Sequence, residues 1–231
     1  MKLTQLQSEF PDESFPPVST ALTDPDGLLA MGGCLSTTRL LNAYQSGIFP
    51  WFNPEDPILW WSPNPRLVLA PTELNLSRSL AKTIRQQRFN FTVDNAFSEV
   101  IEACSGVRND SDDTWISEEM KQAYTKLHHQ GIAHSAEAWQ DGQLVGGLYG
   151  VAIGQVFFGE SMFHTQTDAS KVAFVHLLNH LHLWGYQLVD CQVHSNHLAS
   201  LGAYEISREL FIQKLANFCK KSPHSEAWKK K

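Results

Sequence analysis

The alternation of apolar and polar positions is clearest in the last third of the chain. It runs through residues 135–139, 144–151 and 156–163, and turn signals, Asp141-Gly142 and Ile153-Gly154, separate these runs. Successive side chains of a strand point to opposite faces, and Asp-Gly is a common hairpin turn. The pattern therefore predicts three antiparallel strands joined by two hairpins.

A helix and a fourth strand follow. Thr167 or Asp168 is the expected cap of a helix ending near Trp184, whose apolar stripe predicts one buried face, and residues 188–193 return as a strand. A strand, a crossover helix and another strand form a β-α-β unit, expected to be parallel and right-handed. Together with the hairpins, this predicts an α+β sheet of the acyltransferase type.

The first two thirds of the chain are less regular. We expect residues 1–26 to wrap the surface, and the many prolines among the aromatics of residues 48–66 predict a rigid, irregular loop. The loop aromatics either pack the loop down or form a stacking wall for a planar ligand. Between these segments and the hairpins, we expect a helix from Ser36 or Thr37 to Gly47, a strand at 67–69, and helices at 76–88, 94–104 and 117–129.

Composition fits an ordinary globular protein. The chain has 231 residues, 42% hydrophobic and 18% charged, and a net charge of −6 argues against coating nucleic acid through bulk charge. A local basic patch remains open: four cations spaced three or four apart on the helix at 76–88 are either a solvated face or phosphate contacts. They are Arg78, Lys82, Arg85 and Arg88.

Other classes of site and location have little support. The four cysteines are scattered, and His176 and His180 have zinc spacing without an obvious third ligand, so we expect no metal and no disulfides. No signal peptide or membrane-length apolar run is evident, so we expect a cytoplasmic protein without a membrane partner. We expect no cofactor: residues 164–171, where an acetyl-CoA enzyme would carry a glycine-containing pyrophosphate turn, hold no glycine.

Three polar residues interrupt apolar strand patterns. Asp190 and Gln192 share the face opposite Val189 and Cys191, and alternation directs that face away from the core. Glu160 lies inside an apolar run at 159–163. A polar group on an apolar sheet is costly unless it is paired, so these residues are either satisfied structural groups or a functional site.

With these residues in view, the chain resembles the leucyl/phenylalanyl-tRNA–protein transferases over nearly its whole length. The resemblance is carried by residues 43–52 (AYQSGIFPWF), 59–63 (LWWSP), 146–151 (GGLYGV), 159–163 (GESMF), 190–193 (DCQV) and 199–203 (ASLGA). It implies a small N-terminal domain, 1–65, and a GNAT-like (acyl-CoA N-acyltransferase-like) domain, 66–231, with a disordered tail from about 222. We expect a monomer.

The resemblance also implies the reaction. Leu or Phe, and less readily Met, would move from aminoacyl-tRNA to the N-terminal Arg or Lys of a protein, which marks that protein for N-end degradation. Two alternatives are a CoA-dependent N-acetyltransferase, which the missing glycine turn disfavours, and a non-catalytic tRNA- or peptide-binding module.

The same resemblance assigns roles. Asp190, Gln192 and Glu160 would form the catalytic centre, with Gln192 as the proton acceptor, polarised by Asp190. Because an amide oxygen is a poor base, we expect instead that Gln192 orients the acceptor amine, while Asp190 fixes Gln192 and stabilises developing positive charge. Glu160 is expected to hold the cationic acceptor end. Trp51 and Trp115 would contact the terminal adenosine of the tRNA. The apolar pocket for the donor side chain has six candidates, Leu148, Phe157, Met162, Phe174, Leu177 and Leu181.

One position departs from the resemblance. Cys34 stands where the family usually has Asp, in Gly-Gly-Asp-Leu-Ser. A neutral thiol neither caps a helix nor suits its dipole, so we expect a loss of local stability of about 1 kcal/mol.

Overall fold

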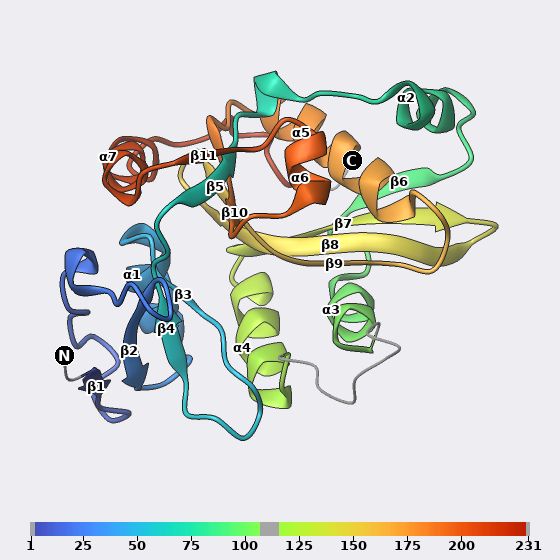
Figure 1. The fold of residues 1–231 in the computed structure, drawn as a ribbon. Helices are drawn as coiled ribbons and strands as arrows, with labels where there is room; N and C mark the ends of the chain where they lie inside the picture. Colours follow the sequence, from blue (N-terminus) through green and yellow to red (C-terminus); the bar gives the residue numbers. More distant parts are fainter. Residues whose placement is uncertain (1–2, 107–115, 230–231) are drawn as a thin grey trace.

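The computed structural model describes residues 3–106 and 116–229, which form two sheets with helices around them (Figure 1). The smaller sheet lies at the N-terminal end of the chain. Its order is β1-β2-β4-β3, with β1 parallel to β2 and the other pairs antiparallel. The strands are β1 Thr4–Leu6, β2 Leu28–Gly32, β3 Phe49–Pro50 and β4 Leu59–Trp61.

The larger sheet has the order β11-β5-β10-β9-β8-β7-β6. All neighbouring pairs are antiparallel except β9 and β10, which are parallel and joined through helix α5. Both hairpins and the β-α-β unit predicted from the sequence are thus confirmed. The strands are β5 Arg66–Leu69, β6 Asn90–Val93, β7 Ala133–Gln140, β8 Gln143–Ile153, β9 Val156–His164, β10 Leu188–Gln192 and β11 Tyr204–Ile206.

Helices cover both faces of the larger sheet, which gives a mixed α+β architecture. Figure 1 shows α5 on one side of β7–β9 and α3 and α4 on the other. None of the described helices is both long and apolar enough to cross a membrane. The helices are α1 Thr37–Gln45, α2 Arg78–Arg85, α3 Phe97–Gly106, α4 Glu118–His129, α5 Ala169–Leu183, α6 Asn196–Ser200 and α7 Arg208–Phe218, with two short 3-10 turns, Val18–Thr20 and Pro71–Glu73.

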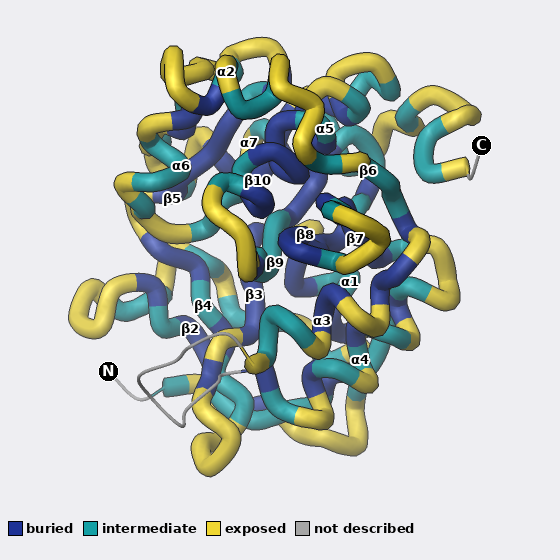
Figure 2. The backbone as a smooth tube through the Cα atoms, turned by 90° about the vertical axis from the view of Figure 1, so that its right-hand side faces the viewer, coloured by how far each residue is buried: buried dark blue, intermediate teal, exposed yellow. Residues whose placement is uncertain are grey.

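Two apolar cores result, one on each face of the larger sheet. One is continuous with the smaller sheet, because Tyr44 and Trp60 belong to the same buried cluster as Val68, Tyr124 and Phe158. The other lies between α5 and the sheet. The tube coloured by burial shows this interior in dark blue (Figure 2). The first core therefore fixes the smaller sheet against the larger one.

The aromatic, proline-rich stretch is more regular than its sequence suggests. Pro50 ends the two-residue edge strand β3, where a missing N–H is tolerated, and β4 lies between β2 and β3 with Trp60 fully buried. The prediction of an irregular loop was therefore wrong for β3 and β4. The sequence pattern also did not predict the short strands β6 and β11 or helix α7.

The C-terminal tail is packed, which corrects the expectation of disorder from residue 222 for the residues that are described. Trp228 stacks on His134 with ring centroids 4.0 Å apart, and it also contacts the rings of Phe157, Trp184 and Tyr186. Its Nε1–H donates to the Tyr186 hydroxyl at 2.7 Å. One aromatic side chain thus anchors the tail to the body of the protein.

Candidate active site

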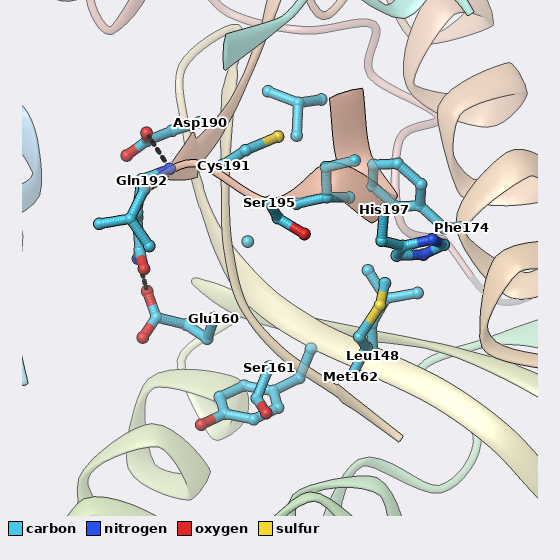
Figure 3. A pocket seen from close by; sticks show the side chains of 15 residues that line it. Leu148, Glu160, Ser161, Met162, Phe174, Asp190, Cys191, Gln192, Ser195 and His197 are labelled. Atoms are coloured by element: carbon cyan, nitrogen blue, oxygen red, sulfur yellow. Dashed lines mark hydrogen bonds between the residues drawn. The ribbon is translucent and has the colours of Figure 1, made fainter. Parts of the chain in front are cut away.

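A cavity opens where β9 and β10 stop pairing. Their ladder ends at the Asp190–Phe158 pair, and the residues beyond it on both strands line a cavity of about 320 Å³. Figure 3 shows Glu160 and Gln192 together at one end, and Leu148, Met162 and Phe174 at the other. The parting of two central strands therefore creates a pocket with a polar end and an apolar end.

Two β-bulges direct the polar side chains. In β9, Glu160 is an extra residue, since Gly159 pairs with Gly150 and Ser161 with Tyr149. In β10, Cys191 is an extra residue between Asp190 and Gln192, which pair with successive residues of β5. Bulges bend a strand and turn side chains away from simple alternation. As a result, Nε2 of Gln192 donates to Oε1 of Glu160 at 3.1 Å, and the backbone of Gln192 has φ +64°.

The Asp190 carboxylate forms a buried ion pair with Arg66. Nε and Nη2 of Arg66 donate to its two carboxylate oxygens at 2.8 and 2.7 Å, and both side chains are at most 1% exposed. The guanidinium of Arg66 lies 4.8 Å from the Phe49 ring centroid and 4.6 Å from that of Phe211. The sequence pattern pointed the Asp190 carboxylate away from the core, and this was wrong because the carboxylate lies in the core with Arg66.

Asp190 nevertheless holds the site in place. Its Oδ1 accepts a hydrogen bond from the backbone N–H of Gln192 at 3.0 Å. This bond fixes the unusual backbone conformation at the bulge, and so it determines where the Gln192 amide points. Arg66 could not be predicted as the partner of Asp190, because the two residues are 124 positions apart.

Glu160 is the centre of a cluster with two tyrosines. The hydroxyl of Tyr44 donates to Oε1 at 2.7 Å and that of Tyr124 to Oε2 at 3.0 Å, and the two hydroxyls also contact each other. Burial raises the pKa of Glu160 to about 8, against the opposing effect of these hydrogen bonds and that from Gln192, and the charge of Asp190 raises it further. Neither tyrosine was predicted as a site residue, since on α1 and α4 both look like ordinary core residues.

The apolar end contains half of the predicted side-chain pocket. Leu148, Met162 and Phe174 line the cavity. The other three candidates belong to the core between α5 and the sheet and are not among the described residues that line this cavity: Phe157, Leu177 and Leu181. Phe157 lies before the point where β9 and β10 separate, and the two leucines lie further along α5 than Phe174. They share their apolar core with two of the lining residues, Leu148 and Phe174.

The predicted tRNA contacts lie on the surface. Trp51 is 46% exposed, with its ring centroid 5.7 Å from that of Trp61, while Trp115 lies outside the described residues. The predicted basic side chains are exposed, and none forms an ion pair with a described residue: Arg78, Lys82 and Arg85 on α2, and Arg88 beyond it. Arg88 is outside the helix because α2 ends at Arg85 and Gln87 has φ +49°.

His176 and His180 have a packing role. Both rings lie 5.1 Å from that of Phe91, and Nδ1 of His180 is 2.8 Å from the carbonyl oxygen of His176. Among the described residues, no cluster of His, Cys, Asp and Glu is arranged to hold a metal ion.

Comparison with known proteins gives the family. Two family models match: residues 33–64 match the leucyl/phenylalanyl-tRNA protein transferase N-terminal domain, and residues 68–216 match the leucyl/phenylalanyl-tRNA protein transferase itself. The leucyl/phenylalanyl-tRNA–protein transferase of Nitrosospira multiformis is 55% identical over 94% of each chain. That of Methylococcus capsulatus is 53% identical over 98% of this chain and 97% of its own.

These matches place the chain among the aminoacyltransferases that use tRNA as donor and protein as acceptor. The chain belongs to the leucyl/phenylalanyl-tRNA–protein transferase family.

Solved structures give only a distant likeness. The structure of L-PGS from Bacillus licheniformis has a TM-score of 0.42 and 12% identity, covering 73% of this chain and 56% of that one. A GCN5-related N-acetyltransferase-like protein from Streptococcus suis has a TM-score of 0.36 and 11% identity, covering 70% and 60%. Likeness at this level does not identify the fold family.

Proposed function

We propose that this transferase moves Leu or Phe, and less readily Met, from aminoacyl-tRNA to the N-terminal Arg or Lys of a protein, which creates an N-end degradation signal. The observation that carries the proposal is the two-ended cavity: an apolar end suited to the donor side chain adjoins an acid–amide end suited to an amine. The reaction joins an activated ester to an amine, and both reactants have to meet in such a space.

The chemistry needs orientation more than a strong base. A chain-terminal amine has a pKa of about 7.7–8.0, so roughly a tenth of it is neutral at pH 7. The amine nitrogen attacks the ester carbonyl, a C–N bond forms, the bond to the tRNA oxygen breaks, and the amine proton ends on that oxygen. Positioning the two reactants supplies much of the rate.

Gln192 is the proposed orienting group. Its Nε2 is occupied by Glu160, whereas its side-chain oxygen has no donor among the described residues. That oxygen is available to accept a hydrogen bond from the incoming amine. Asp190 is a positioning residue in this scheme, because it acts through the backbone N–H of Gln192.

Glu160 is proposed to hold the cationic acceptor end. A carboxylate has about four acceptor positions, and Tyr44, Tyr124 and Gln192 occupy three of them. One position therefore remains for an arginine or lysine group. A bound cation favours the ionised form of Glu160, whose pKa is about 8 without it.

The apolar end is proposed to select the donor. Each CH₂ buried there contributes about 0.8 kcal/mol, which favours Leu, Phe and Met over smaller side chains. We expect β-branched Ile and Val to fit badly, because their bulk lies at Cβ, and Phe174, the residue of the predicted helix stripe that lines the cavity, is proposed to crowd that position.

The tRNA is proposed to contact the exposed surface near the smaller sheet and α2. Trp51, exposed beside Trp61, is suited to stacking on the terminal adenosine, a contact that is worth about 1–3 kcal/mol per base. We propose the same role for Trp115. The exposed cations of α2, together with Arg88, would meet backbone phosphates.

We also propose a division into a small N-terminal domain, residues 1–65, and a GNAT-like domain, residues 66–231. The change from one sheet to the other between β4 and β5 supports it, as does the parallel β9-α5-β10 unit. We propose that the protein acts as a monomer in the cytoplasm, where charged tRNA is found.

A transfer assay tests the proposal. Labelled Leu, Phe, Met, Ile and Val are supplied on their tRNAs to peptides beginning with Arg, Lys or Ala. We expect RNase-sensitive transfer of Leu and Phe, weaker transfer of Met, and use of Arg and Lys ends only. Equal transfer of Val and Leu would contradict the donor cavity, and equal use of Ala and Arg ends would contradict the role of Glu160. Transfer from acetyl-CoA instead would favour the acetyltransferase.

A further inference from the structure

Arg39, on α1, is a buried cation with unused hydrogen-bonding capacity. It is 0% exposed. Its Nη2 donates to the carbonyl oxygens of Gln7, at 2.9 Å, and Phe10, and lies 3.6 Å from the Glu13 carboxylate. Nε and Nη1 have no hydrogen-bond partner among the described residues. A buried charged donor without a partner loses its hydration and gains nothing in exchange. The two unpaired N–H groups of Arg39 therefore favour a nearby anion.

The turn before α1 covers the unpaired N–H groups of Arg39. A Cβ placed on Gly33 would lie 3.2 Å from Cζ, Nε and Nη1 of Arg39, so the backbone at this point rests on the unpaired side of the guanidinium. Cys34 is the next residue and is partly exposed. Burial on its own would raise the pKa of the Cys34 thiol, but hydrogen bonding to Ser36 and the hydrogen bonding and charge of the Arg39 guanidinium outweigh it and lower the pKa from its usual value.

The other three cysteines have the opposite environment. Burial raises the pKa of Cys104 to about 12 and that of Cys219 to about 11. Burial, with the charge of Asp190, also raises the pKa of the Cys191 thiol. Cys34 is thus the cysteine of this chain with the most thiolate at neutral pH, and thiolate is the reactive form.

We propose that Cys34 is a modification site for hydroperoxides, held ready by the unpaired N–H groups of the Arg39 guanidinium. The thiolate sulfur attacks one peroxide oxygen, an S–O bond forms, and the O–O bond breaks. The leaving hydroxide or alkoxide takes a proton, so sulfur loses two electrons and the peroxide gains them. A second peroxide converts the sulfenic acid to a sulfinate in the same way, with a second oxygen added to sulfur.

The sulfinate fits its surroundings better than the thiol does. A sulfinate oxygen can accept from one of the unpaired N–H groups of Arg39, and such a charge-assisted hydrogen bond is stronger than one to a neutral thiol. Arg39 lies on the same helix as Tyr44, which donates to Glu160, so the modification would occur next to an element of the candidate active site.

The first test measures selectivity in the full-length folded protein. After brief exposure to hydrogen peroxide near pH 7, peptide mass spectrometry follows the addition of one and then two oxygens at each cysteine. The pKa of Cys34 is lowered whereas that of Cys219 is about 11, so a larger fraction of Cys34 is thiolate, although a thiolate of lower pKa is intrinsically less nucleophilic. We expect Cys34 to react faster than Cys219, by about tenfold or more. Equal or slower reaction of Cys34 would overturn the proposal.

The second test asks whether Arg39 favours an anion at position 34. Cys34→Asp supplies one, and Cys34→Ser is the neutral control of similar size. We expect the Asp variant to have the higher Tm. An Asp variant no more stable than the Ser variant shows that Arg39 does not favour an anion there, and the proposal fails. The test does not depend on Arg39 variants, which could fail to fold.

Discussion

At the scale of single residues, the protonation of the Glu160 carboxyl affects the stability of the folded protein. Its pKa is 4.5 in an unfolded chain and about 8 in the folded protein, because burial disfavours the ionised form. The folded state therefore binds this proton more tightly. The resulting stabilisation is complete below pH 4.5, decreases as the pH rises, and is lost above about pH 8.

Glu160→Gln tests this directly, because the variant has no group to titrate. Between pH 5 and pH 9, we expect the free energy of unfolding of the wild-type protein to fall relative to that of Glu160→Gln, as measured by urea denaturation. Glu55→Gln, at an exposed loop position, is the matched control and should follow the wild-type protein. Parallel pH profiles for wild-type and Glu160→Gln would contradict the raised pKa.

Asp190 and Gln192 are expected to respond differently to truncation. Asp190→Ala leaves Arg66 buried without its carboxylate, and breaking such a pair costs about 3–5 kcal/mol. Gln192→Ala removes one side-chain hydrogen bond to Glu160, which with a pKa of about 8 is mostly protonated at pH 7, so the cost is about 0.5–1.5 kcal/mol. We therefore expect urea denaturation at pH 7 to show a large loss of stability for Asp190→Ala and a small one for Gln192→Ala, and transfer assays to show that Gln192→Ala lowers kcat. Equal stability losses would contradict this division of roles.

Cys34 shows how a residue-level expectation was changed by the structure. The predicted weakness at the helix start assumed that position 34 caps α1. Ser36 is the cap, because its side chain accepts a hydrogen bond from the backbone N–H of Arg39. The end of the helix is therefore satisfied. The neutral thiol instead leaves two N–H groups of the Arg39 guanidinium without an acceptor among the described residues.

At the scale of elements, regular periodicity was predictable and its interruptions were not. The hairpins β7–β8–β9 and the β9-α5-β10 unit follow from clear alternation, turn residues and one apolar stripe. The bulges at Glu160 and Cys191 leave no mark in the pattern, because an extra residue changes pairing without changing composition. Glu160, Asp190 and Gln192 were therefore found as polar interruptions, while their actual directions and their partners were not.

Helix α2 gives a prediction about tRNA affinity. Each phosphate contact changes the slope of log K against log salt by about 0.7–0.9, so Arg78→Gln with Lys82→Gln should flatten the slope by about 1.4–1.8. The exposed pair Lys220→Gln and Lys221→Gln is the charge-matched control and should leave the slope unchanged. The measurement is tRNA binding between 50 and 200 mM salt. If both double variants give the same slope, α2 is a solvated face.

At the scale of the whole molecule, the tail contributes to the stability of the core it covers. Trp228→Ala removes contacts with the rings of His134, Phe157 and Tyr186, and with them the hydrogen bond to the Tyr186 hydroxyl. Because Trp228 is only partly buried, we expect a loss of about 2–4 kcal/mol, at or below the range for a core Trp→Ala change. Trp228→Phe should recover part of it. Thermal unfolding measures both variants, and an unchanged Tm in the Ala variant would mean that the tail is not coupled to the body.

Two contacts of the candidate site join residues far apart in the sequence. Arg66 and Asp190 are 124 positions apart, and Tyr44 and Glu160 are 116 positions apart. Closing such long loops costs conformational entropy. We therefore expect these two contacts to form after the local hairpins. During synthesis, the segments that carry Tyr44 and Arg66 emerge first and wait for the last third of the chain. A chain synthesised only as far as β9 can therefore form its hairpins, but Arg66 and Glu160 still lack Asp190 and Gln192, so the reaction centre is assembled only after β10 has been made.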